Sequence, residues 1–340
     1  MTVAVAILNY NGADFLAKFL PSVLSNSGDA QIWVIDNQST DNSVEFLKEH
    51  FPQVNLVINE SNGGFAKGYN DGLKNIQADY YVLLNSDVEV TPNWIQPCID
   101  HMENDKMIAA VQPKVIAHHD KKNFEHAGAA GGFLDKNFYP FCRGRIFEEV
   151  EEDKGQYDQD LEVFWASGAC MFVRADLYHQ FGGFDEDFFA HMEEIDLCWR
   201  MKRQNYKVYY SGSSTVYHVG GGTLNYMNPK KTFLNFRNSL FMIVKNYDGI
   251  LFFKLFKRLV LDGIAATLFL FKFQFKHFYA VFRSHMTLYA NWSKFKKKRI
   301  ELRKKSTDFN AVGLYKKSII LKKFLGGIKH YSDLDQNDFC

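Results

Sequence analysis

Five apolar residues run directly into three polar ones in the segment Tyr80-Tyr81-Val82-Leu83-Leu84-Asn85-Ser86-Asp87. The apolar part predicts a buried strand, and the polar part predicts the turn at its carboxyl end. The same pattern occurs three times earlier in the chain, where strands are predicted over Val3–Leu8, Ile32–Ile35 and Val54–Ile58. These four segments indicate a sheet whose strands end in polar residues.

Apolar residues at helical spacing fill the intervals between the predicted strands. They predict helices within residues 15–24, over Ser43–His50 and over Phe65–Ile76. Such an alternation of strands and helices predicts a parallel, doubly wound sheet, which binds ligands at the carboxyl ends of its strands. We therefore expect a nucleotide beside the polar residues that follow three of the strands, namely Asn9, Asn11, Asp36, Asn37, Asn85 and Asp87.

Other classes of site are excluded by motifs that the sequence lacks. No G-x-G-x-x-G follows the first strand and no G-x-x-x-x-G-K-[ST] occurs, which argues against a Rossmann-type dinucleotide site and a P-loop. The five cysteines form no C-x-x-C pair, so neither a zinc ribbon nor a disulfide framework is expected. The first residues lack the basic region of a signal peptide, and we expect a cytosolic protein.

The 340 residues divide into two parts of opposite charge. Residues 1–229 contain 17 Lys and Arg against 32 Asp and Glu, whereas residues 230–329 contain 23 against 4. Hydrophobic residues make up 46% of the chain and aromatic residues 16%, enough for a substantial core, which excludes global disorder. We therefore expect one α/β domain over residues 1–245, followed by a basic amphipathic helical tail over 246–340.

Five segments follow one another in the order Ile7–Gly12, Val34–Asp41, Asn62–Ala66, Leu83–Asp87 and Glu193–Arg200. Together they resemble the family 2 glycosyltransferases of the GT-A fold, and in particular their rhamnosyltransferase-like members. The likeness covers about residues 1–245 and implies a GT-A-type, Rossmann-like, doubly wound mixed sheet. It also implies an inverting transfer of a sugar to a hydroxyl group from a nucleoside-diphosphate donor, with dTDP-rhamnose or a UDP-sugar expected.

A divalent cation is expected because negative charge develops on the diphosphate as it leaves the sugar. Mg²⁺ and Mn²⁺ prefer oxygen ligands, and Asp87, just past a strand end, is the best candidate ligand. The resemblance implies that Asp87 ends the family's D-x-D motif and that His218 completes the metal site. Asn85 stands at the first position of that motif, which leaves one fewer negative charge. The alternatives are an ordinary strand-to-turn cluster and a structural histidine.

The resemblance also implies which residues bind the donor. Asp36 would accept a hydrogen bond from the imide N–H of uracil or thymine, and capping the turn into the next helix is the alternative. Arg237 is suited to the diphosphate, and Lys67 would contact it if it turned inward; a solvated position is the alternative for both. The other donor-binding residues implied are Asn9 and Asn11 beside the base and ribose, Asn62 and Gly63 beside the ribose and phosphate, and Asn85.

Three carboxylates lie within four residues at the start of a predicted helix, on Glu193, Glu194 and Asp196. Acids are favourable at a helix N-terminus, which is one explanation. The resemblance implies another, in which Glu194 is the general base that removes the proton of the acceptor hydroxyl. Asp196 is a rival base, because Glu194 stands where the family has Asp. On the acceptor side we expect Glu193 and Trp165, whose flat face suits a sugar, although Trp165 could equally be a core side chain.

The tail mixes Leu, Ile and Phe with Lys and Arg. Its longest stretch without a basic residue, Leu259–Phe271, has 13 residues and includes Asp262, whereas spanning a bilayer takes about 20 apolar residues. Aromatic-rich helices with many lysines are typical of in-plane membrane attachment, and Lys294–Lys305 adds eight basic residues. The alternatives are a solvated basic face and a helical interface in a homodimer. The apolar content argues against nucleic-acid binding.

These features together predict a transferase that works in the cytoplasm, on the inner face of the cell membrane. Its expected acceptor is a growing, lipid-linked glycan of a bacterial envelope. The run Gly220–Gly222 is expected to let a loop close over the donor. The alternative is a catalytically silent protein that binds a nucleotide sugar and scaffolds an assembly complex, because Asn85 and Glu194 depart from the family's pattern.

Overall fold

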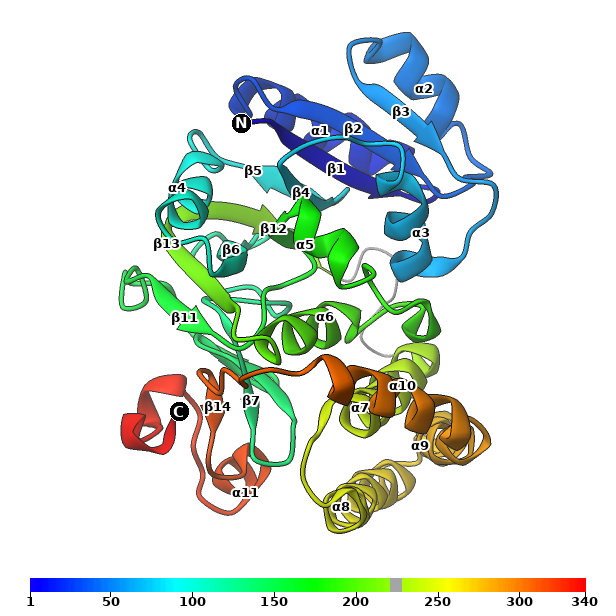
Figure 1. Ribbon diagram of the computed structural model, residues 1–340, viewed down its shortest axis with the longest axis vertical. Coiled ribbons are helices and arrows are strands. Elements are labelled where there is room, and N and C mark those ends of the chain that lie inside the picture. The colour runs from blue at the N-terminus through cyan, green and yellow to red at the C-terminus, as the bar shows by residue number, and fades with distance from the viewer. Residues whose placement is uncertain (221–227) are drawn as a thin grey trace.

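The computed structural model describes residues 1–220 and 228–340. Gly221 and Gly222 of the predicted flexible run therefore lie outside the described residues. The strands and helices of the N-terminal part lie at one end of the long axis of the molecule, and the helices that follow residue 228 lie at the other end (Figure 1).

Nine strands form the main sheet, in the order β11-β13-β6-β12-β4-β1-β2-β3, with β5 paired to β13. β3, β2, β1 and β4 are parallel, as the alternation of strands and helices predicts. β12 runs antiparallel to both β4 and β6, which confirms the mixed sheet that the family resemblance implies. The strands are β1 Val3–Asn9, β2 Gln31–Asp36, β3 Asn55–Ile58, β4 Tyr80–Asn85, β5 Val88–Val90, β6 Ile108–Ala117, β11 Leu161–Val163, β12 Cys170–Arg174 and β13 Lys207–His218.

Both faces of this sheet are covered by helices. Val82 and Leu84 of β4 lie in the core under α1, α2 and α4, whereas Tyr81 and Leu83 lie in the core under α3, α5 and α6. Because successive side chains of a strand point to opposite faces, a strand buried on both sides is apolar on both, as β4 is from Tyr80 to Leu84. These helices are α1 Ala13–Asn26, α2 Ser43–His50, α3 Gly64–Leu73, α4 Gln96–Asn104, α5 Ala175–Gln180 and α6 Glu193–Lys202.

The apolar segment Phe164–Val173 predicts one strand, but the structure has a strand only from Cys170 onward. In the preceding residues the backbone bonds leave the main sheet. The Ser167 N–H donates to the side chain of Gln112 at 2.9 Å, and the Trp165 carbonyl accepts from the Gly132 N–H at 3.2 Å. These bonds pull the segment away from β4 and leave Gly168 partly exposed at the sheet edge.

A second, five-stranded sheet has the order β10-β9-β8-β7-β14. Its fifth strand comes from the far end of the chain, because β14 pairs in parallel with β7. The C-terminal residues thus return to the N-terminal part and extend its smaller sheet (Figure 1). The strands are β7 Gly132–Asp135, β8 Pro140–Cys142, β9 Arg145–Ile146, β10 Glu149–Val150 and β14 Leu314–Tyr315.

Helices dominate the chain after residue 228, where α7 packs against α9 and α10, and α8 packs against α9. Among the residues that the structure describes, we find no helix with the length and apolarity needed to cross a membrane. The boundary at residue 245 remains a prediction, and contacts cross it, since Lys298 bonds Asp185. The helices are α7 Pro229–Asn246, α8 Leu251–Phe271, α9 Phe275–Ala290, α10 Trp292–Lys305 and α11 Ile319–Phe324, and single 3₁₀ turns cover Glu186–Phe188, Tyr331–Asp333 and Gln336–Asp338.

Candidate active site

Asp87 and His218 meet at the carboxyl end of β4. β13 ends at His218 and pairs with β5, which places His218 opposite Val88. The Asp87 Oδ1 atom lies 3.1 Å from His218 Nε2, and the Asn85 Nδ2 atom lies 3.4 Å from the same nitrogen. The first and last residues of the Asn85–Asp87 turn therefore both contact one imidazole nitrogen.

A second carboxylate, on Glu125, occupies the other side of the same imidazole. The Glu125 Oε2 atom lies 3.2 Å from His218 Nδ1, and all three side chains are nearly buried. Burial alone would lower the pKa of His218, but the Asp87 and Glu125 carboxylates outweigh it and raise that pKa to about 10. Burial would raise the pKa of Glu125, and the bond to His218 reverses this and lowers it.

The donor set of Asp87 and His218 fits a divalent cation. Neighbouring ligands of Mg²⁺ or Mn²⁺ lie about 3 Å apart, because each stands about 2.1 Å from the ion, and the observed Oδ1–Nε2 separation is 3.1 Å. A metal-binding histidine generally donates its other ring N–H to a carboxylate, and Glu125 stands at that position. The described residues contain no cluster of three or more His, Cys, Asp or Glu side chains arranged for a metal, so substrate oxygens and water would supply the remaining ligands.

Asn9 and Asp36 lie side by side at the carboxyl ends of β1 and β2. The Asn9 side chain donates to Asp36 Oδ2 at 2.9 Å, and Ser39 donates to both Asp36 oxygens, from its N–H at 2.8 Å and its hydroxyl at 2.7 Å. Asp36 is fully buried, so these bonds hold its carboxylate in one orientation. Asn11 is exposed at the same edge, and its Oδ1 accepts from the Thr40 N–H at 2.7 Å.

The N-terminus of α3 forms the next part of this edge. Asn62 is exposed, and its Oδ1 accepts from the Gly64 N–H at 3.0 Å and from the Asn37 side chain at 2.9 Å. Gly63 precedes the helix, where a Cβ would collide with the Lys67 side chain. Lys67 itself forms an ion pair with Asp71 one turn further along α3. Asn62 and Gly63 thus shape the turn, and Lys67 is directed along the helix.

Glu193 and Glu194 begin α6, and each has a buried carboxylate oxygen without a hydrogen-bond partner among the described residues. Burial raises the pKa of Glu194 to about 7, and backbone hydrogen bonds only partly oppose this. Burial and the charge of Glu194 also raise the pKa of Glu193 well above its ordinary value. A carboxylate of this kind is poised to take up a proton near neutral pH.

The backbone of Gly168 and Ala169 lies between Glu194 and the turn that holds Asp87. A Cβ at Gly168 would lie 3.9 Å from the Cβ of Glu194, and the next residue, Ala169, accepts a hydrogen bond from the Asn85 N–H at 3.0 Å. The side chain of Phe65 borders Gly168 from the α3 side. Gly168 therefore allows the backbone that leads to Ala169 and Asn85 to lie close to Glu194 and Phe65.

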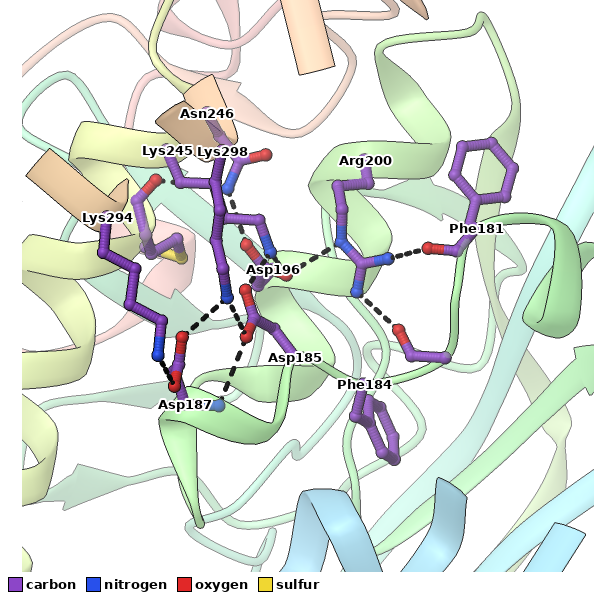
Figure 2. Close-up of polar contacts among 12 residues, drawn as sticks. Phe181, Phe184, Asp185, Asp187, Asp196, Arg200, Lys245, Asn246, Lys294 and Lys298 are labelled. Atoms are coloured by element: carbon purple, nitrogen blue, oxygen red, sulfur yellow. Dashed lines mark hydrogen bonds and ion pairs between the residues drawn. The ribbon is translucent and has the colours of Figure 1, made fainter. Parts of the chain in front are cut away.

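Asp196, two residues further along α6, has different surroundings (Figure 2). Its Oδ2 accepts from Arg200 at 2.8 Å and from Lys245 at 2.7 Å, and its Oδ1 accepts from Asn246 at 2.7 Å. The side chain has no exposed surface. Its two oxygens are therefore fully engaged in joining α6 to α7.

Residues 4–182, more than half of the chain, match the sequence pattern of the family described as Glycosyl transferase family 2. The chain belongs to glycosyltransferase family 2. It is thus an enzyme of the class that transfers sugars. The residues described above lie at the carboxyl edge of its main sheet, where sheets of this kind bind ligands.

Two relatives of this glycosyltransferase are rhamnosyltransferases. The N-acetylglucosaminyl-diphospho-decaprenol L-rhamnosyltransferase of Mycobacterium tuberculosis is 24% identical over 230 residues, which make up 63% of this chain and 75% of that protein. Rhamnosyltransferase WbbL of Escherichia coli K12 is 21% identical over 217 residues, which make up 61% of this chain and 80% of that protein.

Two solved structures share the fold. GalNAc-T7, crystallised with UDP, GalNAc and Mn²⁺, superposes with a TM-score of 0.62 at 15% identity, over 96% of this chain but only 57% of the GalNAc-T7 chain. Mannosyltransferase PcManGT from Pyrobaculum calidifontis, in complex with GDP-Man and Mn²⁺, superposes with a TM-score of 0.52 at 13% identity, over 88% of this chain and 84% of its own. These likenesses establish the GT-A fold.

Two residues expected to contact substrates have protein partners in this glycosyltransferase. Trp165 is nearly buried and donates its indole N–H to the Phe133 carbonyl at 3.0 Å, which is the core position named as the alternative. Arg237, on α7, donates to the carbonyls of Asp187 and Phe188 at 3.1 and 2.8 Å. Both side chains thus support the backbone around the site.

Glu125 and Asn238 are residues of this site that the sequence did not reveal. Glu125 lies in the connection between β6 and β7, with no motif around it. Asn238 is fully buried and donates to three carbonyls, of Phe188, Ala190 and His191, at 2.9, 2.8 and 2.7 Å. Its position next to Arg237, in the Arg-Asn pair of α7, was the one available signal.

The carbonyls that Asn238 binds belong to a strained loop that ends at Glu193. Phe189, His191 and Met192 have φ values of 67°, 70° and 73°, in the left-handed region that side chains other than glycine rarely adopt. Such conformations persist only where surrounding contacts hold them. The Arg237–Asn238 pair supplies these contacts and so fixes where α6 begins.

Proposed function

We propose that this glycosyltransferase is an inverting, metal-dependent enzyme. It would move a sugar from dTDP-rhamnose or a UDP-sugar to a hydroxyl of a cell-envelope glycan or lipid-linked acceptor. The single observation that supports this most is Glu194, which has a pKa raised by burial to about 7 and one buried carboxylate oxygen without a hydrogen-bond partner among the described residues, beside Gly168. The two rhamnosyltransferase relatives favour a deoxyhexose donor.

Asp87 and His218 would hold Mg²⁺ or Mn²⁺, with Glu125 orienting the imidazole. When bound, the cation neutralises the charge that develops on the departing diphosphate. Asn85 contacts the same imidazole nitrogen as Asp87 does and, as a neutral amide, adds no charge. The ion would therefore be held by one carboxylate and one imidazole of the protein, together with the donor's phosphate oxygens.

Glu194 would act as the general base. Its carboxylate takes the proton of the acceptor hydroxyl, that oxygen forms the new bond to the anomeric carbon, and the bond to the diphosphate breaks on the opposite face. A single displacement of this kind inverts the configuration. We assign the base to Glu194 rather than Asp196, because both oxygens of Asp196 are engaged by Arg200, Lys245 and Asn246. Glu193 would face the acceptor.

The donor would bind along the carboxyl edge of β1, β2 and β4. Asp36, oriented by Asn9 and Ser39, would receive the base, with Asn11 beside it. The α3 N-terminus at Asn62 and Gly63 would follow the ribose and phosphates, since backbone N–H groups there attract anions. Lys67 and Arg237 would contact the diphosphate only after leaving their present partners, Asp71 and the 187–188 carbonyls.

A lipid-linked acceptor would place the reaction at the cytoplasmic, inner face of the cell membrane. The basic tail over residues 246–340 would hold the enzyme there as a peripheral protein.

Thermal unfolding with UDP, dTDP, GDP, CMP and NAD, each with and without Mn²⁺, tests the donor site. We expect UDP or dTDP to raise the midpoint temperature of unfolding only when Mn²⁺ is present. At a nucleotide concentration a hundredfold above Kd, binding adds about 2.7 kcal/mol to the free energy of unfolding. Glu194→Gln should retain this shift, whereas Asp87→Ala should lose its metal-dependent part. A retained shift without any sugar transfer by the wild type would indicate the catalytically silent scaffold instead.

A further inference from the structure

The outward faces of α8 and α9 reverse the usual distribution of polar and apolar side chains. On α8, the side chains packed against the protein include Arg258 and Asp262, which are 3% and 0% exposed. The side chains that point outward are large and apolar, and they recur at intervals of three or four residues, which is one stripe of a helix. They are Phe252, Phe256, Val260, Ile264, Leu268 and Phe271, between 47% and 75% exposed, with Phe253 beside them at 68%.

The adjoining helix α9 also exposes a stripe of large apolar side chains. Its buried side combines the polar or small His277, Ala280 and Ser284 with Val281 and Leu288. Its outward stripe consists of Phe275, Tyr279, Phe282, Met286 and Tyr289, each at least 44% exposed. At the turn between the two helices Phe273 is 80% exposed. Two packed helices thus each expose a stripe of large apolar side chains, unlike the isolated apolar side chains common on soluble proteins.

Buried charge fixes this orientation of α8. Arg258 donates to Asp262 at 2.9 Å, and the Tyr139 hydroxyl donates to the same carboxylate at 2.8 Å. The guanidinium of Arg258 also lies over the Tyr139 ring, 3.5 Å from its centroid. Rolling α8 to bury its phenylalanines would bring Arg258 and Asp262 out of these contacts. The aromatic stripe is therefore directed outward by the fold itself.

The charged residues near the exposed apolar stripes of α8 and α9 indicate what kind of partner these helices bind. Lys257, Lys272, Lys276 and Arg283 are exposed on these two helices and the turn between them, whereas the one acidic residue between 249 and 300 is the buried Asp262. A symmetric contact with a second copy would set these cations against themselves without a countercharge. A surface that offers both apolar depth and negative charge is an anionic lipid bilayer.

We propose that the α8–α9 surface docks on an anionic lipid bilayer, with both helices in the plane of the membrane. The phenylalanines enter the acyl boundary, Tyr279 and Tyr289 lie at headgroup depth, and the lysines contact lipid phosphates. α11 lies at the same end of the long axis of the molecule and adds Phe324 and Leu325, 67% and 82% exposed (Figure 1). This deepens the proposed membrane location and rests on the proposed function only for the lipid-linked acceptor.

Flotation of the full chain with vesicles tests this docking. We expect the protein to float with vesicles of equal parts phosphatidylcholine and phosphatidylglycerol, and less with phosphatidylcholine alone or at high salt. The variant Phe253→Ser with Phe256→Ser should bind about a hundredfold more weakly, since each exposed phenylalanine is worth about tenfold. Met107→Ser with Val150→Ser, which removes two exposed apolar side chains elsewhere, should bind like the wild type.

Three results would overturn the proposal. They are no flotation of the wild type with either vesicle, equal flotation of both double variants, or a concentration-dependent dimer that only the phenylalanine variant abolishes. The nucleotide-induced thermal shift is measured on the same proteins in the absence of lipid. A lost vesicle contact with an intact shift refutes only the docking surface, and an intact vesicle contact without a shift refutes only the donor site.

Discussion

The first turn of α6 holds two kinds of buried carboxylate. Glu193 and Glu194 each have an oxygen without a partner among the described residues, and burial raises the pKa of both. Asp196, two positions on, accepts three hydrogen bonds, from Arg200, Lys245 and Asn246. All three share one helix end, so the helix dipole favours each of them about equally.

The difference between these carboxylates lies in the neighbours that tertiary structure brings. Cations from α6 and α7 surround Asp196, whereas Glu194 lies beside Gly168, which Phe65 also borders. A buried charge with partners joins helices, and a buried charge without partners destabilises the fold unless it is protonated. We infer that the unpaired site is retained for chemistry and the paired site for stability. Each prediction below tests one side of this contrast.

The largest effect is expected for Glu194→Gln. The amide has nearly the shape of the carboxylate but cannot accept a proton, so sugar transfer should fall by about 10²–10⁴-fold. Donor binding, followed by the Mn²⁺-dependent thermal shift, should be unchanged. Glu49→Gln, an exposed change on α2, is the control and should have full activity. If Glu194→Gln transferred sugar at the wild-type rate, the base would have to be another group.

Asp196→Asn should have the largest effect on stability. It leaves Lys245 and Arg200 buried without their shared countercharge, which we expect to lower the free energy of unfolding by about 3–5 kcal/mol. Denaturant unfolding measures this directly. Adding Arg200→Met should recover part of the loss, because the buried charge that has lost its countercharge is then absent, whereas Lys245 still pairs with Asp185. A stable Asp196→Asn that has lost its activity would instead make Asp196 the base.

Glu194→Gln should also make the protein more stable at alkaline pH. The pKa of Glu194 is about 7 in the folded protein against an ordinary value of 4.5. The folded state therefore binds this proton more tightly, and the wild type loses stability as the pH rises from about 4.5 through 7. Glutamine has no proton to lose in this range, so the variant does not lose stability in this way. We expect the variant to exceed the wild type by about 1–3 kcal/mol at pH 8 and by little at pH 5.

Unfolding of both proteins across this pH range measures the effect. Glu193 is present in both proteins, but the charge of Glu194 raises its pKa, so Glu194→Gln also lowers the pKa of Glu193 and the measured difference belongs to the two carboxylates together. A constant difference at pH 5 and pH 8 would mean that Glu194 is already charged at pH 5 in the folded state. The contrast with Asp196 would then rest on geometry alone.

The fold followed from local sequence because its signals are local. The helix over Ser43–His50 has the predicted bounds, and the strand Tyr80–Leu84 extends by one residue. The helix predicted to start with three acidic residues begins at Glu193. β14 could not be predicted, since two residues have no periodicity, and its pairing with β7 depends on a return of the chain from residue 314.

The candidate site followed from sequence only where a residue belonged to a motif. The resemblance paired Asp87 with His218, and the structure places them 3.1 Å apart. Glu125 reaches the same imidazole because β6 and β13 lie side by side, which no local pattern encodes. The hydrogen bonds that engage Asp196 come in part from Lys245 and Asn246, about fifty positions later in the chain. Sequence spacing therefore could not separate the paired carboxylate from the unpaired ones.

The smallest effects are expected where the basic helix α10 meets the loop before α6. Lys298 bonds Asp185 at 2.6 Å and Asp187 at 2.7 Å and is 27% exposed, whereas Lys294 bonds Asp187 alone and is 52% exposed (Figure 2). We expect Lys298→Met to lower the free energy of unfolding by about 1 kcal/mol and Lys294→Met by less than about 0.5 kcal/mol, because water screens the more exposed pair.

These two variants also test whether the ion pairs around Asp196 can be changed without affecting Glu194. Asp185 shares Lys245 with Asp196, so Lys298 belongs to the network that holds α6 and not to the surroundings of Glu194. At a temperature where both variants are folded, kcat and KM should match the wild type. A fall in kcat for Lys298→Met with unchanged KM and stability would mean that α10 positions the general base through the strained 189–192 loop. The positions of Asp196 and Glu194 would then depend on the same contacts.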